Sequence, residues 1–392
     1  HTAHLPLQIV PLRPLLEASQ AYGFAHGAFN VNTAAQAQAV IEIHSTFRSA
    51  AILQGADLAN AFMGGRADFK NGTVADKQLG AARIMQAVRA ASETVDIPIV
   101  MHLDHGRDFD SIKAAISGGY TSVMIDGSSL PYEQNVELTR EVVRYAHERG
   151  VSVEGELGVL AGVEDDVFSD TSTYTNPMLV CDFFRKTGVD CLAISYGTMH
   201  GANKGAHVKL RREIAIAASE NLRHEHIFGV LVSHGSSTVP QYIVEEINAL
   251  GGSIHGAAGV PLQELQQAIP CGIGKINVDT DIRLAITRNI REFFVRHPEK
   301  QGSTSIAAIW ALMEQNPSEF DPRAYLVPVM EPLITGAKIT DPDLLCIVDC
   351  IKRGVKEAVG TLIVSFGSVG YASKIPCVSL EEMAERYRRE GI

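Results

Sequence analysis

The sequence lacks the long apolar runs that cross a lipid bilayer. A membrane-spanning helix needs about 18 or more consecutive apolar residues, and no run in the 392 residues approaches that length. We therefore expect no membrane partner. We expect the protein in the cytoplasm, but the sequence begins with His1 rather than Met. An organelle, reached after removal of a targeting segment, therefore stays open.

Basic charge is also scarce. The chain has 34 Lys and Arg against 45 Asp and Glu, which gives a formal net charge of −11 at pH 7. A general nucleic-acid-binding protein needs a basic face to meet the phosphate backbone. We therefore exclude nucleic acid as a partner, while a local basic pocket for a phosphorylated small molecule remains compatible with this charge.

Cysteine is sparse as well, with 6 residues and no CxxC pair. Cysteines in mostly apolar surroundings indicate buried thiols in a reducing compartment, and they argue against a disulfide framework. The glycine pattern GxGxxG does not follow the first apolar run. Its absence argues against a dinucleotide-binding fold.

Short apolar runs are what the sequence has instead. They are rich in small and aliphatic residues, end in small or polar residues and alternate with helix-like stretches. The eight runs are residues 28–31, 51–54, 97–103, 122–125, 151–156, 191–195, 228–233 and 273–278. This alternation predicts an α/β protein with a parallel sheet. Eight repeats over roughly 250–290 residues match the size of a (β/α)8 TIM barrel, and a doubly wound open sheet is the alternative.

The last part of the chain has a different pattern, mostly helical and interrupted by prolines. We expect residues 1–295 to form the barrel. Residues 296–392 are expected to form a helical C-terminal extension that belongs to the same domain or contacts a neighbouring subunit. Ser379 and Glu382 have the spacing of a capping box ahead of a final charged helix.

Polar residues follow the predicted strands, where a parallel barrel has its active face. His105, His200 and His234 follow three different runs, and each precedes a glycine. Neutral imidazoles suit Zn2+, and three protein ligands leave one position open for substrate. We therefore predict a zinc site. For any one of these histidines alone, a surface or hydrogen-bonded role is the more common alternative.

Several further residues are candidates with two interpretations each. His102, inside the third run, is predicted to face the barrel interior or to support a metal ligand. Asp126 and Glu156 are either capping or buried-network carboxylates, or they hold a second cation or the histidines of the first metal. Acidic residues 164–166 form a solvated turn, or a loop that brings in a proton-transfer carboxylate. Lys204 is a phosphate ligand or an exposed loop lysine.

Ser237 and Thr280 could add hydroxyl donors at the loops after the seventh and eighth runs, where such barrels commonly bind phosphate. The alternative for both is a turn or cap residue.

Six motifs in order resemble the class II, zinc-dependent fructose-bisphosphate aldolases. They are HLDHG, MIDGSSLPYEQNVELTREVV, EGELGVLAG, YGTMHGANKG, LVSHGSSTVPQ and KINVDTDIRLA. The resemblance covers roughly residues 20–295. Two later segments, NPSEFDPRAYL and ASKIPCVSLEEMAERY, resemble the longer-tailed branch of that family.

The resemblance implies a role for each matching residue. His105, His200 and His234 match the zinc ligands. Asp104 matches the acid/base that serves the C4 hydroxyl, and Glu164 matches the loop carboxylate that moves the C3 proton. The positions associated with an auxiliary cation, divalent or monovalent, are Asp126 and Glu156.

The substrate pocket is implied in the same way. The positions matched to the pocket for dihydroxyacetone phosphate are Gly201, Lys204, Gly235, Ser236, Ser237, Asn277, Val278, Asp279 and Thr280. Arg283 matches an arginine that, in some members, reaches a neighbouring subunit's phosphate site, so a homodimer or homotetramer is implied.

The expected reaction is the reversible cleavage of fructose 1,6-bisphosphate to dihydroxyacetone phosphate and glyceraldehyde 3-phosphate through a zinc-stabilised enediolate. It belongs to glycolysis, gluconeogenesis or the Calvin cycle. Tagatose-bisphosphate aldolases share most of the motifs, so that sugar is an alternative. Class I aldolases use a lysine Schiff base instead. The lysine nearest the predicted site, Lys275, lies inside the eighth run, and we expect it to face outward.

The sequence departs from the family pattern at Ala56, which stands where a phosphate-contacting serine is usual, and at Thr33, where Asn is common. Residues 299–317 resemble an insertion. Two other function classes therefore stay open. One is a zinc-dependent hydrolase on the same barrel, and the other is a non-catalytic sugar-phosphate-binding protein.

Overall fold

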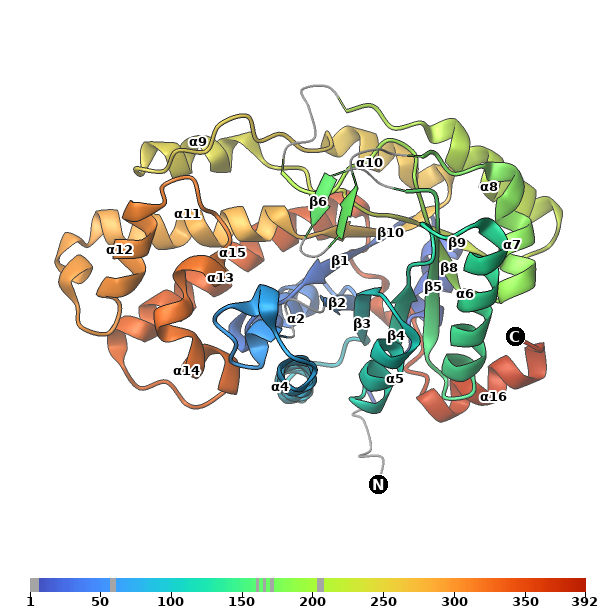
Figure 1. The fold of residues 1–392 in the computed structure, drawn as a ribbon, viewed down its shortest axis with the longest axis horizontal. Coiled ribbons are helices and arrows are strands. Elements are labelled where there is room, and N and C mark those ends of the chain that lie inside the picture. Colours follow the sequence, from blue (N-terminus) through green and yellow to red (C-terminus); the bar gives the residue numbers. More distant parts are fainter. Residues whose placement is uncertain (1–6, 57–60, 160–161, 165–166, 170–172, 203–207) are drawn as a thin grey trace.

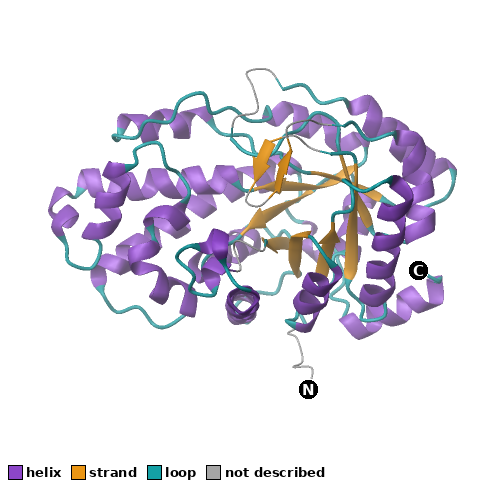
Figure 2. Cartoon of the chain, viewed as in Figure 1, coloured by secondary structure: helices purple, strands orange, loops and turns teal. Residues whose placement is uncertain are grey.

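The predicted barrel is confirmed. A computed structural model describes residues 7–56, 61–159, 162–164, 167–169, 173–202 and 208–392. Eight parallel strands close into one barrel in the order β1-β10-β9-β8-β5-β4-β3-β2, with helices packed around the outside (Figures 1 and 2). The barrel strands are β1 His26–Asn30, β2 Ala51–Gly55, β3 Ile99–Gly106, β4 Ser122–Ile125, β5 Ser152–Leu157, β8 Cys191–Ile194, β9 Val230–Ser233 and β10 Ile273–Val278.

Helices follow the strands as the alternating pattern requires. Those of the barrel are α1 Arg13–Tyr22, α2 Ala34–Thr46, α4 Val74–Ser92, α5 Phe109–Ser117, α6 Tyr132–His147, α7 Val180–Thr187, α8 Arg212–His224, α9 Gln241–Ala249, α10 Leu262–Ala268 and α11 Thr280–Arg296. Short 3-10 turns are η1 Phe69–Asn71, η2 Pro177–Leu179, η3 Ile269–Cys271, η4 Pro298–Gly302, η5 Val327–Val329 and η6 Tyr371–Lys374.

The two faces of each strand pack into different apolar layers, because successive side chains point to opposite sides of a sheet. Phe29, Leu53 and Met101 belong to the layer between the barrel and its helices. Ala28 and Ile52, one residue before Phe29 and Leu53, belong to a second cluster inside the barrel. Side chains of α1 join that inner cluster, so α1 closes the amino-terminal end of the barrel.

Strand β3 is longer than predicted and irregular at its end. Its pairing with β4 shifts between Leu103 and Gly106, and His105 takes a left-handed backbone conformation with φ +53°. A non-glycine residue is uncommon there, and an extra residue in one strand re-aims the side chains around it. Asp104 and His105 therefore lie within the strand rather than in the loop after it.

A small antiparallel hairpin was not predicted. It joins β6 Gly162–Glu164 to β7 Val167–Ser169, and it lies in the connection between β5 and β8. Its strands are only three residues long, and the segment includes the acidic sequence 164–166, which resembles a loop. The residues around it, 160–161, 165–166 and 170–172, lie outside the described residues.

The C-terminal region is helical, with α12 Ala307–Gln315, α13 Pro322–Tyr325, α14 Met330–Thr335, α15 Pro342–Phe366 and α16 Leu380–Glu390. Helix α15 packs along α11 and α2. A Cβ at Gly354 would lie 2.7 Å from the backbone of Ile286, so α15 and α11 approach closely. Ser379 caps α16 by accepting the amide of Glu382 at 3.0 Å, while the reciprocal bond of a capping box is not present among the described residues.

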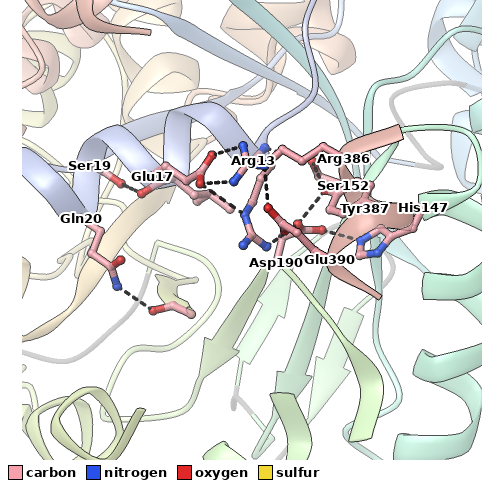
Figure 3. A network of polar contacts seen from close by, with 12 residues as sticks. Arg13, Glu17, Ser19, Gln20, His147, Ser152, Asp190, Arg386, Tyr387 and Glu390 are labelled. Atoms are coloured by element: carbon pink, nitrogen blue, oxygen red, sulfur yellow. Dashed lines mark hydrogen bonds and ion pairs between the residues drawn. The ribbon is translucent and has the colours of Figure 1, made fainter. Parts of the chain in front are cut away.

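A buried polar cluster attaches α16 and α1 to the amino-terminal end of the barrel (Figure 3). Both carboxylate oxygens of Asp190 accept hydrogen bonds. Oδ1 accepts from Arg13 at 3.1 Å and from the hydroxyl of Tyr387 at 2.6 Å. Oδ2 accepts from the backbone of Val153 at 2.7 Å and lies 2.9 Å from Nε2 of His147. The rings of His147 and Tyr387 stack, with centroids 3.6 Å apart.

No helix in the described part of the chain is both long and apolar enough to span a membrane. All six cysteines are free thiols, as predicted, but only Cys181, Cys191 and Cys350 are buried. Cys271 and Cys346 are partly exposed and Cys377 is exposed, so the prediction of buried thiols is wrong for these three.

Candidate functional site

The three predicted histidines meet at the carboxyl end of the barrel. His105 comes from the end of β3, His200 from the loop after β8, and His234 from the residue after β9. The ring centroids of His105 lie 5.4 Å from those of both His200 and His234, and the remaining pair is 6.4 Å apart. All three are buried, with exposed fractions of 6%, 4% and 1%. Histidines from three distant segments of the chain, 95 and 34 positions apart in sequence, therefore form one cluster.

This cluster fits zinc in its donor set. Rings bound to one tetrahedral zinc through Zn–N bonds of about 2.0–2.1 Å have centres roughly 5 Å apart, which is close to the separations seen here. Nδ1 of His234 is buried and makes no hydrogen bond to the described residues. As they stand, no group of three or more His, Cys, Asp or Glu side chains within the described ranges is arranged to hold a metal.

Asp104 lies beside the first histidine. It is 3% exposed, and its Oδ1 is 3.6 Å from Nε2 of His105. Its Oδ2 accepts one long hydrogen bond, 3.4 Å, from the amide of Asn30. Oδ1 is buried and has no hydrogen-bond partner among the described residues. A carboxylate so weakly engaged can still exchange a proton with a bound molecule.

Asp126 and Glu156 form a carboxyl pair on neighbouring strands. Burial and the adjacent Asp126 raise the pKa of Glu156 well above its ordinary value. Burial acts to raise the pKa of Asp126 too, but hydrogen bonds from Glu156 and Ser128 and the nearby His105 hold it below its ordinary value. The two neighbouring buried carboxyl groups therefore differ in their tendency to ionise. The auxiliary cation predicted at these positions stays a prediction.

The loops after β9 and β10 form one hydrogen-bonded unit. Oγ of Ser237 accepts the amides of Asp279 and Thr280 at 3.3 and 3.1 Å, at the start of α11. Asp281 accepts the amides of Thr238 at 3.2 Å and Val239 at 2.9 Å. These bonds fix the loop at the amino terminus of α11, where backbone amides suit phosphate.

The backbone of this unit is strained. Val239 has φ +50°, which is an outlier for a β-branched residue. Gly235 has φ +56°, and a Cβ there would lie 2.4 Å from the carbonyl oxygen of Met199. Only glycine allows the His234 loop to lie this close to the His200 loop. Strain of this kind gathers at functional sites, where surrounding contacts maintain it.

The other predicted pocket residues lie around the same loops. Gly201 follows His200 and is partly buried, and Asn277, Val278, Asp279 and Thr280 are buried at the end of β10. The hydroxyl of Ser236 is bonded to Ser233 at 2.7 Å and to the His234 carbonyl at 3.0 Å, so it is used within the loop.

Arg283 is held within its own chain in this structure. Its guanidinium lies 2.6 Å from Asp279 and 3.4 Å from Asp321. Two predicted residues cannot be placed in this way. Lys204 lies outside the described residues, and Glu164 is described only as backbone in β6.

Lys275 does not face outward as expected. It is fully buried inside the barrel, and Nζ donates to Gln54 at 2.9 Å, Glu154 at 2.9 Å and Asn277 at 2.8 Å. Burial acts to raise the pKa of Glu154, but Lys275 and His234 hold it below the usual range of a carboxyl group. His102 is interior as predicted, with Nδ1 2.7 Å from Oγ of Ser122.

The sequence analysis missed Asn30, Gln54 and Glu154 as site residues. A sequence signal was available for Glu154, and also for the inward direction of Lys275, because strand side chains alternate with a period of two. Glu154 lies two residues before Glu156, and Lys275 lies two before Asn277. Each therefore shares an interior face with a predicted site residue.

A cavity of about 650 Å³ lies away from the histidines, between α6, α7 and α16. Its lining includes Arg140, Arg144 and Arg388, together with His147 and Tyr387 of the amino-terminal cluster. Of the lining residues, Arg144, Arg185 and Lys186 lie in the last turns of α6 and α7, where basic side chains complement the helix dipoles.

The family model and the curated relatives that match this chain carry the same family description. The profile described as "Fructose-bisphosphate aldolase class-II" matches residues 10–339. A fructose-bisphosphate aldolase of Giardia intestinalis is 37% identical over 383 residues, covering 97% of this chain and 100% of the relative. One from Treponema pallidum is 38% identical over 344 residues, covering 85% and 94%.

Solved structures share the fold. The YdjI aldolase of Escherichia coli K12 superposes with a TM-score of 0.61 at 22% identity, covering 93% of this chain and 99% of that one. A fructose-bisphosphate aldolase of Campylobacter jejuni gives a TM-score of 0.62 at 20% identity, covering 92% and 95%.

Proposed function

Because the chain belongs to the class II fructose-bisphosphate aldolase family, we propose that its histidine cluster cleaves fructose 1,6-bisphosphate reversibly to dihydroxyacetone phosphate and glyceraldehyde 3-phosphate. The enzyme is an aldehyde-lyase of a zinc-dependent family. The observation that carries the assignment of the site is the meeting of His105, His200 and His234, with centroids 5.4–6.4 Å apart, at the carboxyl end of the barrel.

Cleavage requires two proton transfers. Asp104 takes the proton of the C4 hydroxyl, C4 becomes the aldehyde carbon, and the electron pair of the C3–C4 bond passes into the neighbouring ketone. Glu164 returns a proton to C3, which completes dihydroxyacetone phosphate. Two carboxyl groups in different places suit this division of labour. Zinc, when bound by the three histidines, supplies Lewis-acid stabilisation of the negative charge that collects on the ketose oxygen.

Phosphate recognition is assigned to the loops after β8, β9 and β10. The start of α11, where the amides of Asp279 and Thr280 donate to Oγ of Ser237, lies at the same end of the barrel as the histidines. A helix amino terminus favours an anion through its dipole. Lys204 adds a cation from the loop after His200. Ala56, buried at the end of β2, supplies no hydroxyl to the aldehyde-side phosphate.

We also propose that residues 296–392 belong to the barrel domain, that the protein is a homodimer or homotetramer, and that it works in the cytoplasm. Residues of α15 share one apolar cluster with the barrel helices, which supports the first statement. Six free thiols suit a reducing compartment. Light scattering of the purified protein tests the subunit number, and a monomer would contradict it.

A cleavage assay with fructose and tagatose 1,6-bisphosphates, with and without a chelator, tests the proposed reaction. We expect triose phosphates from the fructose substrate, loss of activity with the chelator and recovery with added zinc. Full activity in metal-stripped protein would contradict the zinc assignment. A preference for the tagatose substrate, or release of inorganic phosphate, would select a different reaction.

A further inference from the structure

A line of buried polar side chains crosses the interior of the barrel beneath the histidines. Lys275 is its centre, with an ammonium group whose three hydrogen-bond donors all have partners. Neither Lys275 nor Glu154 has any exposed surface. Both charges are therefore removed from water, and each depends on the other.

One branch of this line leads to a predicted metal ligand. Oε1 of Glu154 accepts from Lys275 at 2.9 Å, and Oε2 lies 2.5 Å from Nε2 of His234. A carboxylate can only accept, so the proton of the His234 ring is on Nε2. Nδ1 is then the nitrogen with a free lone pair, and it is the buried atom that has no hydrogen-bond partner among the described residues.

The other branch leads to the predicted acid/base. Gln54 accepts from Lys275 through its side-chain oxygen and donates from its amide nitrogen to Asn30 at 3.0 Å. Asn30 in turn donates to Asp104 at 3.4 Å. The orientation of each amide is set by its neighbour, because Lys275 can only donate and the Asp104 carboxylate accepts. One ammonium group thus orients groups on both sides of the site.

An ion pair buried in this way is poorly explained by stability alone. Desolvation of two charges costs as much as their attraction returns, and apolar replacements of similar volume are often neutral or stabilising. Neighbouring interior positions include the apolar Val100, Met124 and Val232, together with His102, whose Nε2 lies 3.5 Å from Oε1 of Glu154. The charged pair itself lies in the layer next to the histidines.

We propose that Glu154 and Lys275 are positioning residues of the zinc site, through which the Nδ1 atom of His234 is presented to the metal while Asp104 is oriented in parallel. The inference rests on the proposed zinc function and assigns these two residues a task in it. Carboxylate partners of this kind set the tautomer and orientation of metal-binding histidines, and their loss typically weakens metal affinity about 10–100-fold.

The test compares four variants with the wild-type protein: Glu154→Gln, Lys275→Met, the double variant Glu154→Gln/Lys275→Met, and the control Asp190→Asn. Asp190 is a buried carboxylate that is also beside a histidine, but at the opposite end of the barrel. The zinc dissociation constant is measured by competition with a chelator. The visible spectrum of the cobalt-loaded protein reports the geometry of the metal site, which a general loss of stability does not change.

We expect Glu154→Gln to weaken zinc binding about 10–100-fold and to alter the cobalt spectrum. The double variant should lose no more affinity than the weaker-binding single variant, because both residues act through His234. Asp190→Asn should keep the wild-type affinity and spectrum. If Lys275→Met does not fold because Glu154 is left unpaired, the double variant, which removes both charges, decides the role of Lys275.

Wild-type affinity and spectrum in folded Glu154→Gln and in the double variant would overturn the inference. An equal loss of affinity in Asp190→Asn would overturn it too, because the effect would then be one of stability. Absence of zinc binding by the wild-type protein would instead contradict the proposed function, so the two failures are distinguishable.

Discussion

The two ends of the barrel bury similar groups in different states. At the amino-terminal end, Asp190 accepts four hydrogen bonds, shared between both of its oxygens (Figure 3). At the carboxyl end, Asp104 accepts one long bond, and its Oδ1 has no hydrogen-bond partner among the described residues. A carboxylate whose oxygens both accept hydrogen bonds from the protein fixes structure. A carboxylate with an oxygen that accepts none can accept a hydrogen bond from a ligand.

The backbone does not divide the two ends in the same way. His105 and Val239, with φ +53° and +50°, lie at the carboxyl end. Arg48 and His226, with φ +54° and +57°, precede β2 and β9 and therefore lie at the amino-terminal end. The contrast between the ends lies in how their carboxylates are hydrogen-bonded.

The largest expected effect is the loss of a metal ligand. His105→Ala, His200→Ala or His234→Ala should lower aldolase turnover by on the order of a thousandfold or more, since Lewis-acid stabilisation is worth several kcal/mol. Zinc content by mass spectrometry should fall in parallel. His147→Gln, at the opposite end, is the matched control and should retain zinc and turnover. A His234→Ala variant that lacks zinc but keeps its activity would contradict the assigned difference between the two ends of the barrel.

The second-largest effect concerns the proton of the C4 hydroxyl, which Asp104 is proposed to take. Asp104→Asn should reduce turnover by roughly 10²–10⁴-fold, the usual contribution of a positioned acid/base, while zinc remains bound. Steady-state kinetics and metal analysis on one preparation check both parts. A rate equal to that of the wild-type protein would remove the assigned role of Asp104.

Removing the carboxylate of Asp190 should act on stability instead. Asp190→Asn removes the closer carboxylate beside the buried Arg13 and leaves only Glu17, 3.9 Å from its Nε. Breaking a buried ion pair typically costs about 3–5 kcal/mol. Chemical unfolding should show this loss, whereas turnover at low temperature should match the wild-type value. A fall in turnover of the folded variant, without a loss of stability, would contradict the division between the two ends.

The sequence predicts much of this arrangement. Runs of Val and Ile located all eight barrel strands, and the histidines were placed together because parallel strand ends share one face. The hairpin β6–β7 was missed because its strands are only three residues long and the segment includes the acidic sequence 164–166, which resembles a loop. The partners of Lys275 could not be predicted, because contacts across the interior depend on the stagger of the closed barrel. The left-handed backbone of His105 likewise arises from the shifted pairing of β3 with β4.

The smallest expected effect is a difference in acid sensitivity. Burial acts to raise the pKa of Asp190, but His147, Arg13 and Tyr387 lower it to about 2. Its unfolded value is about 3.9, so the stabilisation is complete above that pH and is lost as pH falls toward 2. The loss should be roughly 2–3 kcal/mol. Between pH 5 and pH 2, the free energy of unfolding should therefore fall less steeply in Asp190→Asn than in the wild-type protein. An equal dependence on pH in the two proteins would contradict the lowered pKa of Asp190.

The central claim is that three histidines from distant parts of the chain bind one zinc ion. Anomalous diffraction at the zinc edge, from crystals of the zinc-loaded protein, tests it directly. We predict a single strong peak about 2.0–2.1 Å from a ring nitrogen of each of His105, His200 and His234, with Nδ1 as the nitrogen of His234. A correctly folded, zinc-loaded barrel whose peak lies elsewhere, or whose three rings remain beyond bonding distance of it, would contradict the claim.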